Sequence, residues 1–160
     1  MGLSVLLREP PDGIIHFAGH GLVDDVQGAP RFLIELEQNT TLSLTEWRGL
    51  LRAGTTHSLY FLNACDVGQA KEVANFVEGW GPVILEGGGS GFIGGMWPLS
   101  DKAASDFASV FYCKLLEGSK TGAVEVADLV RVARRKFAET GDPTYLGYVF
   151  YGDVGLKLVP

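Results

Sequence analysis

The sequence lacks the features that mark several common classes of protein. Its 160 residues include two cysteines, Cys65 and Cys113, in unlike surroundings, which do not make a disulfide framework and fit a reducing compartment. Lys and Arg number 13 against 19 Asp and Glu, and the net charge of −6 argues against nucleic-acid binding. No apolar run approaches the length of about 18 uncharged residues that a membrane-spanning helix needs. Residues 1–7 lack the basic residues that begin a signal peptide. We therefore expect a cytoplasmic protein that binds no nucleic acid directly and no membrane.

Apolar residues, in contrast, are plentiful enough for a core. Hydrophobic residues make up 46% of the chain and charged residues 20%, which excludes a disordered protein. Strand-like segments alternate with helix-like ones, which predicts one α/β domain over residues 1–160 with a mainly parallel sheet. The predicted strands are 13–18, 31–37, 40–44, 58–63, 82–85, 91–96, 148–151 and 156–159, with 31–37 and 40–44 forming a hairpin around Gln38-Asn39. The predicted helices run from the capping box Ser43–Glu46 to about Gly54, and over about 68–79, 100–118 and 121–140.

Two segments that follow predicted strands contain the residues best suited to chemistry. They are His16-Phe-Ala-Gly-His20-Gly21 and Leu62-Asn-Ala-Cys65-Asp66. Ligands and catalytic groups collect at the carboxyl ends of strands in an open α/β sheet, so neighbouring strands would bring His20 and Cys65 to one edge. An imidazole can convert a thiol to a thiolate, and the N-terminus of the helix predicted over 68–79 would add its dipole. Gly21 leaves an unhindered backbone N–H of the kind that an oxyanion hole uses.

Each of these residues also has an ordinary structural interpretation. A free cysteine at a strand end is commonly a small buried hydrophobe, and a histidine in such a turn commonly serves the structure. His16 lies inside its strand, where we expect it in the core or supporting the site. Cys113, in the middle of a predicted helix, is expected among core residues, as are Trp47 and Trp80. The cluster 131–136 is expected to be a solvated helix face.

Cofactor motifs are poorly supported. Residues 89–94 match the pattern G-x-G-x-x-G, but Gly94 lies inside a predicted strand and Pro98, not a helix, follows. These glycines fit a mobile loop or a close approach of substrate better. No phosphate-binding G-x-x-x-x-G-K-[ST] occurs, and His16 and His20 are four residues apart on a strand and turn, which does not favour a zinc site. We therefore expect no cofactor and no metal ion.

The His20 and Cys65 segments resemble the two signature blocks of the CHAT domains, a branch of the caspase-like cysteine peptidases. The segment Gly94-Gly-Met-Trp-Pro-Leu-Ser-Asp101 is similar to the one that follows the family's fifth strand, and Leu146–Asp153 is similar to its last strand. The resemblance covers nearly the whole chain, in order. It implies a caspase-like (caspase-haemoglobinase) sheet flanked by helices and the activity of a cysteine endopeptidase, a thiol protease acting on proteins or peptides.

Catalytic roles follow from this resemblance, position by position. Cys65 corresponds to the nucleophile and His20 to the general base, and the backbone N–H groups of Cys65 and Gly21 correspond to the oxyanion donors. Caspase-like enzymes work without a third, orienting carboxylate.

Substrate-binding roles follow in the same way. Trp97 falls where the family lines its substrate cleft, and Asp101 lies close by in the sequence. Asn63 stands two residues before the nucleophile, where some relatives that cut after basic residues have Asp. Together with Asp66, these residues favour a basic or uncharged residue over an acidic one at the cleavage position.

The resemblance also implies a missing part. In the caspase-like fold two strand–helix units precede the strand with the catalytic histidine, whereas 12 residues precede Gly13 here. A sheet that begins at the histidine strand would leave an apolar edge uncovered. We expect this chain to be the C-terminal two-thirds of a CHAT domain. The remainder would come from a separate chain, from a regulatory sensor or repeat module, or from self-association.

Two other functions stay open. A catalytically silent module with the same fold would act by binding a partner. A nucleotide-binding α/β protein rests on the glycine-rich segment alone.

Overall fold

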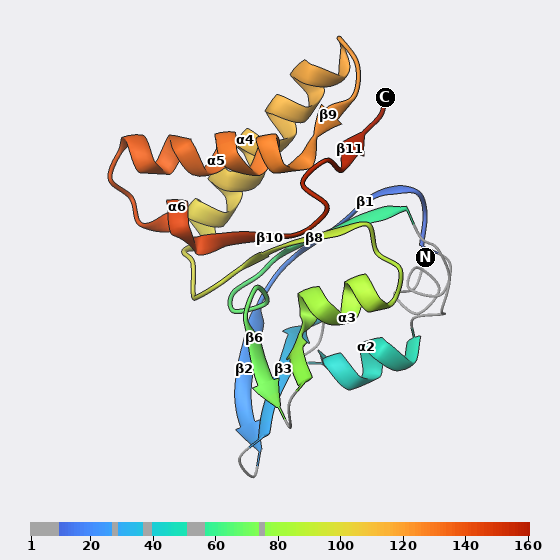
Figure 1. The fold of residues 1–160 in the computed structure, drawn as a ribbon. Coiled ribbons are helices and arrows are strands. Elements are labelled where there is room, and N and C mark those ends of the chain that lie inside the picture. The colour runs from blue at the N-terminus through green and yellow to red at the C-terminus, as the bar shows by residue number, and fades with distance from the viewer. Residues whose placement is uncertain (1–9, 27–28, 37–39, 51–56, 74–75) are drawn as a thin grey trace.

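The computed structural model describes residues 10–26, 29–36, 40–50, 57–73 and 76–160 (Figure 1). The strands are β1 (Gly13–Ala18), β2 (Gly21–Val26), β3 (Ala29–Glu35), β4 (Thr41–Ser43), β5 (Ser58–Asn63), β6 (Ala70–Val73), β7 (Phe76–Gly79), β8 (Gly91–Gly95), β9 (Val124–Glu125), β10 (Tyr148–Gly152) and β11 (Lys157–Leu158). The helices are α2 (Leu44–Leu50), α3 (Trp80–Glu86), α4 (Asp101–Ser119), α5 (Val126–Glu139) and α6 (Thr144–Gly147).

A four-stranded sheet with the order β1-β5-β8-β10 forms the centre of the molecule. β1 pairs parallel with β5, and β5 pairs parallel with β8, whereas β10 pairs antiparallel with β8. Helices α4, α5 and α6 lie on one side of this sheet, and α2 and α3 lie on the other (Figure 1). The predicted α/β fold with a mainly parallel sheet is confirmed, and it is consistent with a caspase-like fold.

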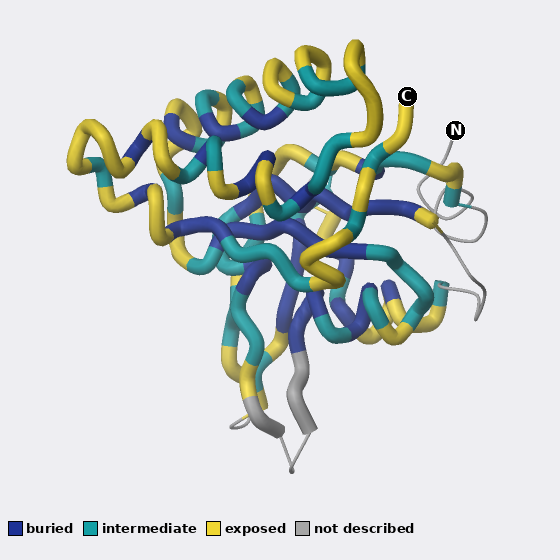
Figure 2. Tube along the Cα trace, turned by 45° about the horizontal axis from the view of Figure 1, so that its top comes forward, coloured by how far each residue is buried: buried dark blue, intermediate teal, exposed yellow. Residues whose placement is uncertain are grey.

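β5 connects the two halves of the core. All six of its residues are buried, as expected for a parallel strand covered on both faces. Tyr60 and Leu62 pack in the cluster that contains Trp47 and Trp80, on the side of α2 and α3. Leu59 and Phe61 pack on the other side, against aromatic and aliphatic residues of α4 and α5. Figure 2 shows the buried strands running through the middle of the molecule, with exposed residues on the outer turns of the helices.

The predicted hairpin is confirmed as the pairing of β3 with β4, with Leu33 opposite Ser43. β2, which the sequence did not predict, adds to it antiparallel on the other side of β3. The capping box is also confirmed, because the backbone N–H and hydroxyl of Ser43 donate to Glu46 Oε2 and the Glu46 N–H donates to Ser43 Oγ at 3.2 Å. The predicted turn at Gln38-Asn39 and the predicted helix end near Gly54 lie outside the described residues.

Three predicted elements are different in the structure. The helix expected over 68–79 is wrong, because this segment contains the antiparallel pair β6 and β7. The strand expected over 82–85 is wrong, because these residues belong to α3, where Pro82 occupies the first turn and needs no N–H partner. The helix expected over 121–140 begins only at Val126, since the two residues before it form β9 and pair with β11.

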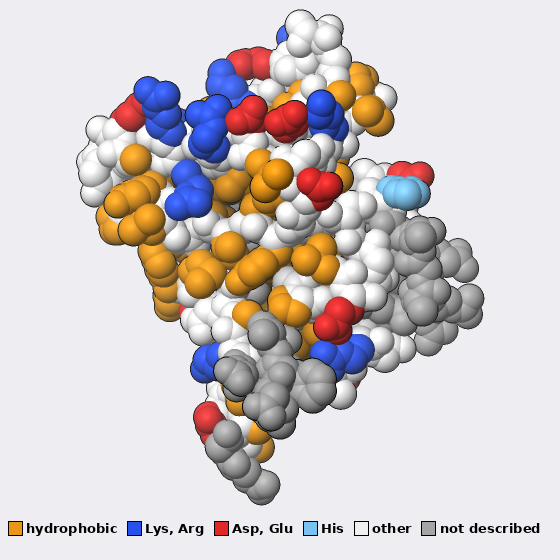
Figure 3. Space-filling model, in the orientation of Figure 1, with side chains coloured by type: hydrophobic (Ala, Val, Ile, Leu, Met, Phe, Trp, Pro, Cys, Tyr) orange, Lys and Arg blue, Asp and Glu red, His pale blue; other side chains and the backbone are white. Residues whose placement is uncertain are grey.

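The outer face of α5 is charged, as predicted. Arg131 pairs with Asp128, and Arg135 pairs with Glu139, in exposed bridges spaced along the helix. Figure 3 shows Lys, Arg, Asp and Glu side chains across the upper part of the molecule, over α5, with hydrophobic side chains gathered below them. In the part of the chain that the structure describes, no helix combines the length and the apolar character needed to cross a bilayer.

Helix α4 allows a direct test of the core. Phe107 is fully buried and stacks on Tyr148 with ring centroids 3.6 Å apart, whereas Leu116 on the same helix is 64% exposed. We expect Phe107→Ala to lower the free energy of unfolding by about 3–5 kcal/mol and Leu116→Ala by less than about 0.5 kcal/mol. Urea denaturation of both variants measures the difference, and equal losses would contradict the assigned packing.

Candidate active site

The pairing of β1 with β5 brings the two predicted segments together. Ala18 and Asn63 are paired at the ends of their strands, and the Gly19 N–H donates to the Asn63 carbonyl at 3.3 Å. A Cβ on Gly21 would overlap the carbonyl oxygen of Cys65, so the chain after β1 runs directly against the chain after β5. Only glycine permits this approach. The His20-Gly21 backbone therefore lies beside Cys65, at the carboxyl end of the sheet.

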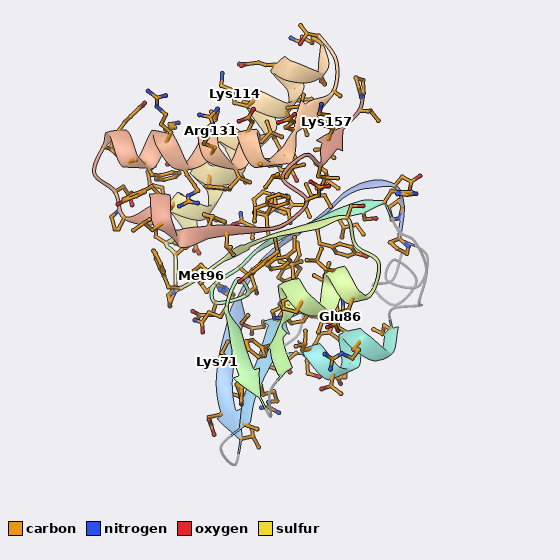
Figure 4. The ribbon with its side chains drawn as sticks, in the orientation of Figure 1. Lys71, Glu86, Met96, Lys114, Arg131 and Lys157 are labelled. Carbon is orange, nitrogen blue, oxygen red and sulfur yellow. The ribbon has the colours of Figure 1, made fainter. Side chains whose placement is uncertain are left out.

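The Cys65 thiol is half-buried and contacts the segment between β8 and α4. The Leu99 N–H donates to Cys65 Sγ at 3.3 Å, and the Leu99 carbonyl lies 3.7 Å from the same sulfur as an acceptor. Leu99 belongs to residues 96–100, which we call the β8–α4 segment. Figure 4 labels Met96, its first residue, whose N–H donates to the Gly147 carbonyl at 2.8 Å.

The loop after Cys65 is held by local hydrogen bonds. Asp66 has a φ of 58°, in the left-handed region that Asp tolerates better than most residues. The Gln69 side chain donates to the Asp66 carboxylate at 2.7 Å and to the Met96 carbonyl at 3.1 Å, and the Gly68 N–H donates to the Gly95 carbonyl. Because no helix follows this loop, the expected dipole of a helix over 68–79 is wrong. The helix that begins near the sulfur is α4, two residues after Leu99.

Asn63, two residues before the cysteine, is buried and bonded within the protein. Its Nδ2 donates to the Ala104 carbonyl in α4 at 3.1 Å, and its Oδ1 accepts from the Tyr148 hydroxyl at 2.5 Å. Burial raises the pKa of Tyr148, and the nearby Cys65 raises it further, so this hydroxyl remains a donor.

His20 is exposed and lines a groove of about 780 Å³ between the end of β1 and one face of α4. His16 lies in the same groove, with its ring stacked on Phe61 at 4.6 Å and its Nδ1 3.0 Å from the Tyr112 hydroxyl. Partial burial lowers the pKa of His16, which favours its neutral form. The groove is lined by His16, Ala18, Gly19, His20, Asn63, Asp101, Ala104, Ser105, Ala108, Ser109, Tyr112, Cys113 and Leu116.

Cys113 is exposed, so the prediction that it lies in the core is wrong. It lines the groove because it lies on a different face of α4 from the buried Phe107 and Phe111. Within the described ranges, no three His, Cys, Asp or Glu side chains gather in a way that could hold a metal ion.

Comparison with known protein families matches the CHAT domain over residues 3–146. The chain belongs to the CHAT domain family. This is a family of caspase-like peptidases, and the match includes both the His20 and the Cys65 segments. A search of curated proteins finds no match.

The remaining predicted residues of this CHAT domain are arranged around the same edge. Trp97 is 37% exposed in the β8–α4 segment, and Asp101 is the exposed first residue of α4 and lines the groove. Asp66 lies in the loop after Cys65. Sequence reasoning missed Leu99 and Tyr148, which contact Cys65 and Asn63, because nothing in their local sequence marks them.

The close approach of Gly21 to the Cys65 backbone can be tested by substitution. Gly21→Ala would force its Cβ against the Cys65 backbone, so we expect a loss of about 1–3 kcal/mol in the free energy of unfolding. Gly49→Ala in α2 is the matched control, since a Cβ there meets nothing within 4 Å and alanine favours a helix by up to about 1 kcal/mol. Thermal unfolding compares the two variants. An equal response to both would contradict the contact between Gly21 and Cys65.

Proposed function

We propose that this CHAT domain is a cysteine endopeptidase with Cys65 as nucleophile and His20 as general base. The observation that supports it best is the β1–β5 pairing, which sets the His20-Gly21 backbone beside Cys65. The two residues follow adjacent strand ends, and catalytic hydrogen bonds often tighten only when substrate binds.

The proposed reaction has two stages. His20 takes the thiol proton, Cys65 Sγ attacks the peptide carbonyl carbon, and the C–N bond breaks as His20 returns the proton to the leaving amine. Water then attacks the thioester with His20 as base, which releases the carboxylic acid and restores the thiol. The N–H groups of Gly21 and Cys65 would bind the oxyanion.

We further propose Trp97 and Asp101 as side chains that contact the substrate, because both are exposed and lie two residues on either side of Leu99, which contacts the Cys65 sulfur. Asn63 and Asp66 would act from within the protein, where their side chains already accept hydrogen bonds. The carboxylates of Asp66 and Asp101 favour a basic or uncharged residue at the cleavage position, and a peptide library dominated by Asp there would contradict this preference.

The alternative proposal is a silent interaction module. The specific observation in its favour is that Leu99 contacts the Cys65 sulfur through both its N–H and its carbonyl. A peptide with a thiol-reactive electrophile separates the two functions. A peptidase would be labelled at Cys65 at neutral pH and spare the exposed Cys113, whereas a silent module would be labelled at Cys113 alone.

Substitution of the proposed catalytic pair is the decisive experiment. We expect Cys65→Ala and His20→Ala each to reduce peptide cleavage at least about 1000-fold without loss of fold, and the double variant to be no worse than either. Cys113→Ser, at the other cysteine, should keep full activity. Full cleavage by Cys65→Ala in the same assembly would refute the mechanism.

We also propose that another segment of polypeptide adds to β1 and packs against α4. Among the described strands β1 pairs only with β5, and an extended segment can bond to the second edge of such a strand. This segment would be the N-terminal part of the domain, from a longer protein, from a partner chain with a sensor or repeat module, or from a second copy.

Sedimentation tests this proposal on the isolated chain. We expect self-association, because an open strand edge beside a partly apolar groove pairs with another copy when no other partner is present. Ser105→Arg places a charge on the exposed groove wall and should weaken association, whereas Ala138→Arg on exposed α5 adds the same charge and should not. A fully active monomer without any partner would contradict the proposal.

A further inference from the structure

The Leu99 N–H is a polar group held on the Cys65 sulfur, and it comes from a segment without regular structure. A hydrogen bond to sulfur stabilises the thiolate only if the donor stays in place when the proton leaves. The effect of the Leu99 N–H on the thiolate therefore depends on the contacts that fix the β8–α4 segment.

One attachment of this segment is to Gly147, the last residue of α6, directly before β10. The Met96 N–H donates to the Gly147 carbonyl at 2.8 Å. A Cβ on Gly147 would lie 2.8 Å from Leu99 Cδ2, so the Leu99 side chain packs directly on the Gly147 backbone. Gly147 is followed at once by Tyr148, and the position of Tyr148 therefore sets the position of this contact.

The other attachment is to the first turn of α4. Ser100 caps the helix, because its hydroxyl oxygen accepts from the Ala103 N–H at 3.2 Å. The carbonyl of Ala104, in the same first turn, accepts from Asn63 Nδ2 at 3.1 Å. Asn63 lies on β5, two residues before Cys65. The helix start is thus tied to the strand that carries the sulfur.

One buried hydrogen bond joins these two attachments, because the Tyr148 hydroxyl donates to Asn63 Oδ1. We propose that Asn63 and Tyr148 are positioning residues, which together hold the β8–α4 segment so that the Leu99 N–H stays on the Cys65 sulfur. This role rests on the proposed function of Cys65 as a nucleophile. Neither residue needs to touch the substrate: both side chains work from beneath the site.

The rate of alkylation by iodoacetamide as a function of pH tests the proposal. The background is Cys113→Ser, which leaves Cys65 as the one thiol of the chain. Tyr148→Phe removes the hydroxyl and keeps the ring that stacks on Phe107. We expect the midpoint of the alkylation profile to rise by about half a pH unit or more, since the thiolate loses a fixed donor.

Tyr145→Phe is the matched control, because it makes the same change at an exposed tyrosine and should leave the profile at the wild-type midpoint. The double variant Asn63→Leu/Tyr148→Phe removes both partners, so no buried polar side chain remains unpaired between them. It should be at least as stable to urea as Tyr148→Phe alone and still show the raised midpoint.

A folded Tyr148→Phe protein with the wild-type midpoint would overturn the proposal. If that variant does not fold, the double variant decides in the same way. Absence of peptide cleavage by the wild type together with a raised midpoint in the variants would count against the proposed function alone. Cleavage by the wild type with unchanged midpoints would count against the positioning role alone.

Discussion

The parallel pairing of β1 with β5 is the contact on which the arrangement of this domain depends. Two segments about 45 residues apart in the sequence leave the sheet at the same level because Ala18 is paired with Asn63. A shift of one residue in this register would turn every side chain of β1 to the opposite face and separate Gly21 from the Cys65 carbonyl. The geometry of the candidate site is therefore set mainly by the pairing of the strands and less by the polar side chains.

The strength of that pairing comes from the core on both sides of β5. Tyr60 and Leu62 are enclosed by the layer with the two buried tryptophans, and Leu59 and Phe61 by the aromatic cluster under α4 and α5. A strand buried on both faces has little freedom to slide or twist. The half-buried thiol thus follows a central strand of the sheet that is buried on both faces, which keeps the entropic cost of organising the site low.

The secondary-structure elements that the sequence predicts correctly are those that the local pattern of residues determines by itself. The apolar run of β5, the capping box at the start of α2 and the helical pattern of α4 are each determined by neighbouring residues in the sequence. The sequence predicts the wrong secondary structure for residues 68–79 and 82–85, because a short apolar segment fits both the helical and the strand periodicity. Contacts with the rest of the fold decide between the two. The Leu99–Cys65 and Tyr148–Asn63 contacts span 34 and 85 positions, so no spacing rule leads to them.

Helix α4 has a double attachment that links two parts of the molecule. Its first turn is bonded to Asn63 beneath the sulfur, and the face that follows forms one wall of the groove at the β1 edge. A polypeptide that binds the groove more tightly in one position of α4 would be linked to any ligand of the thiol site that also prefers one position of α4. By thermodynamic reciprocity, each would change how tightly the other is held.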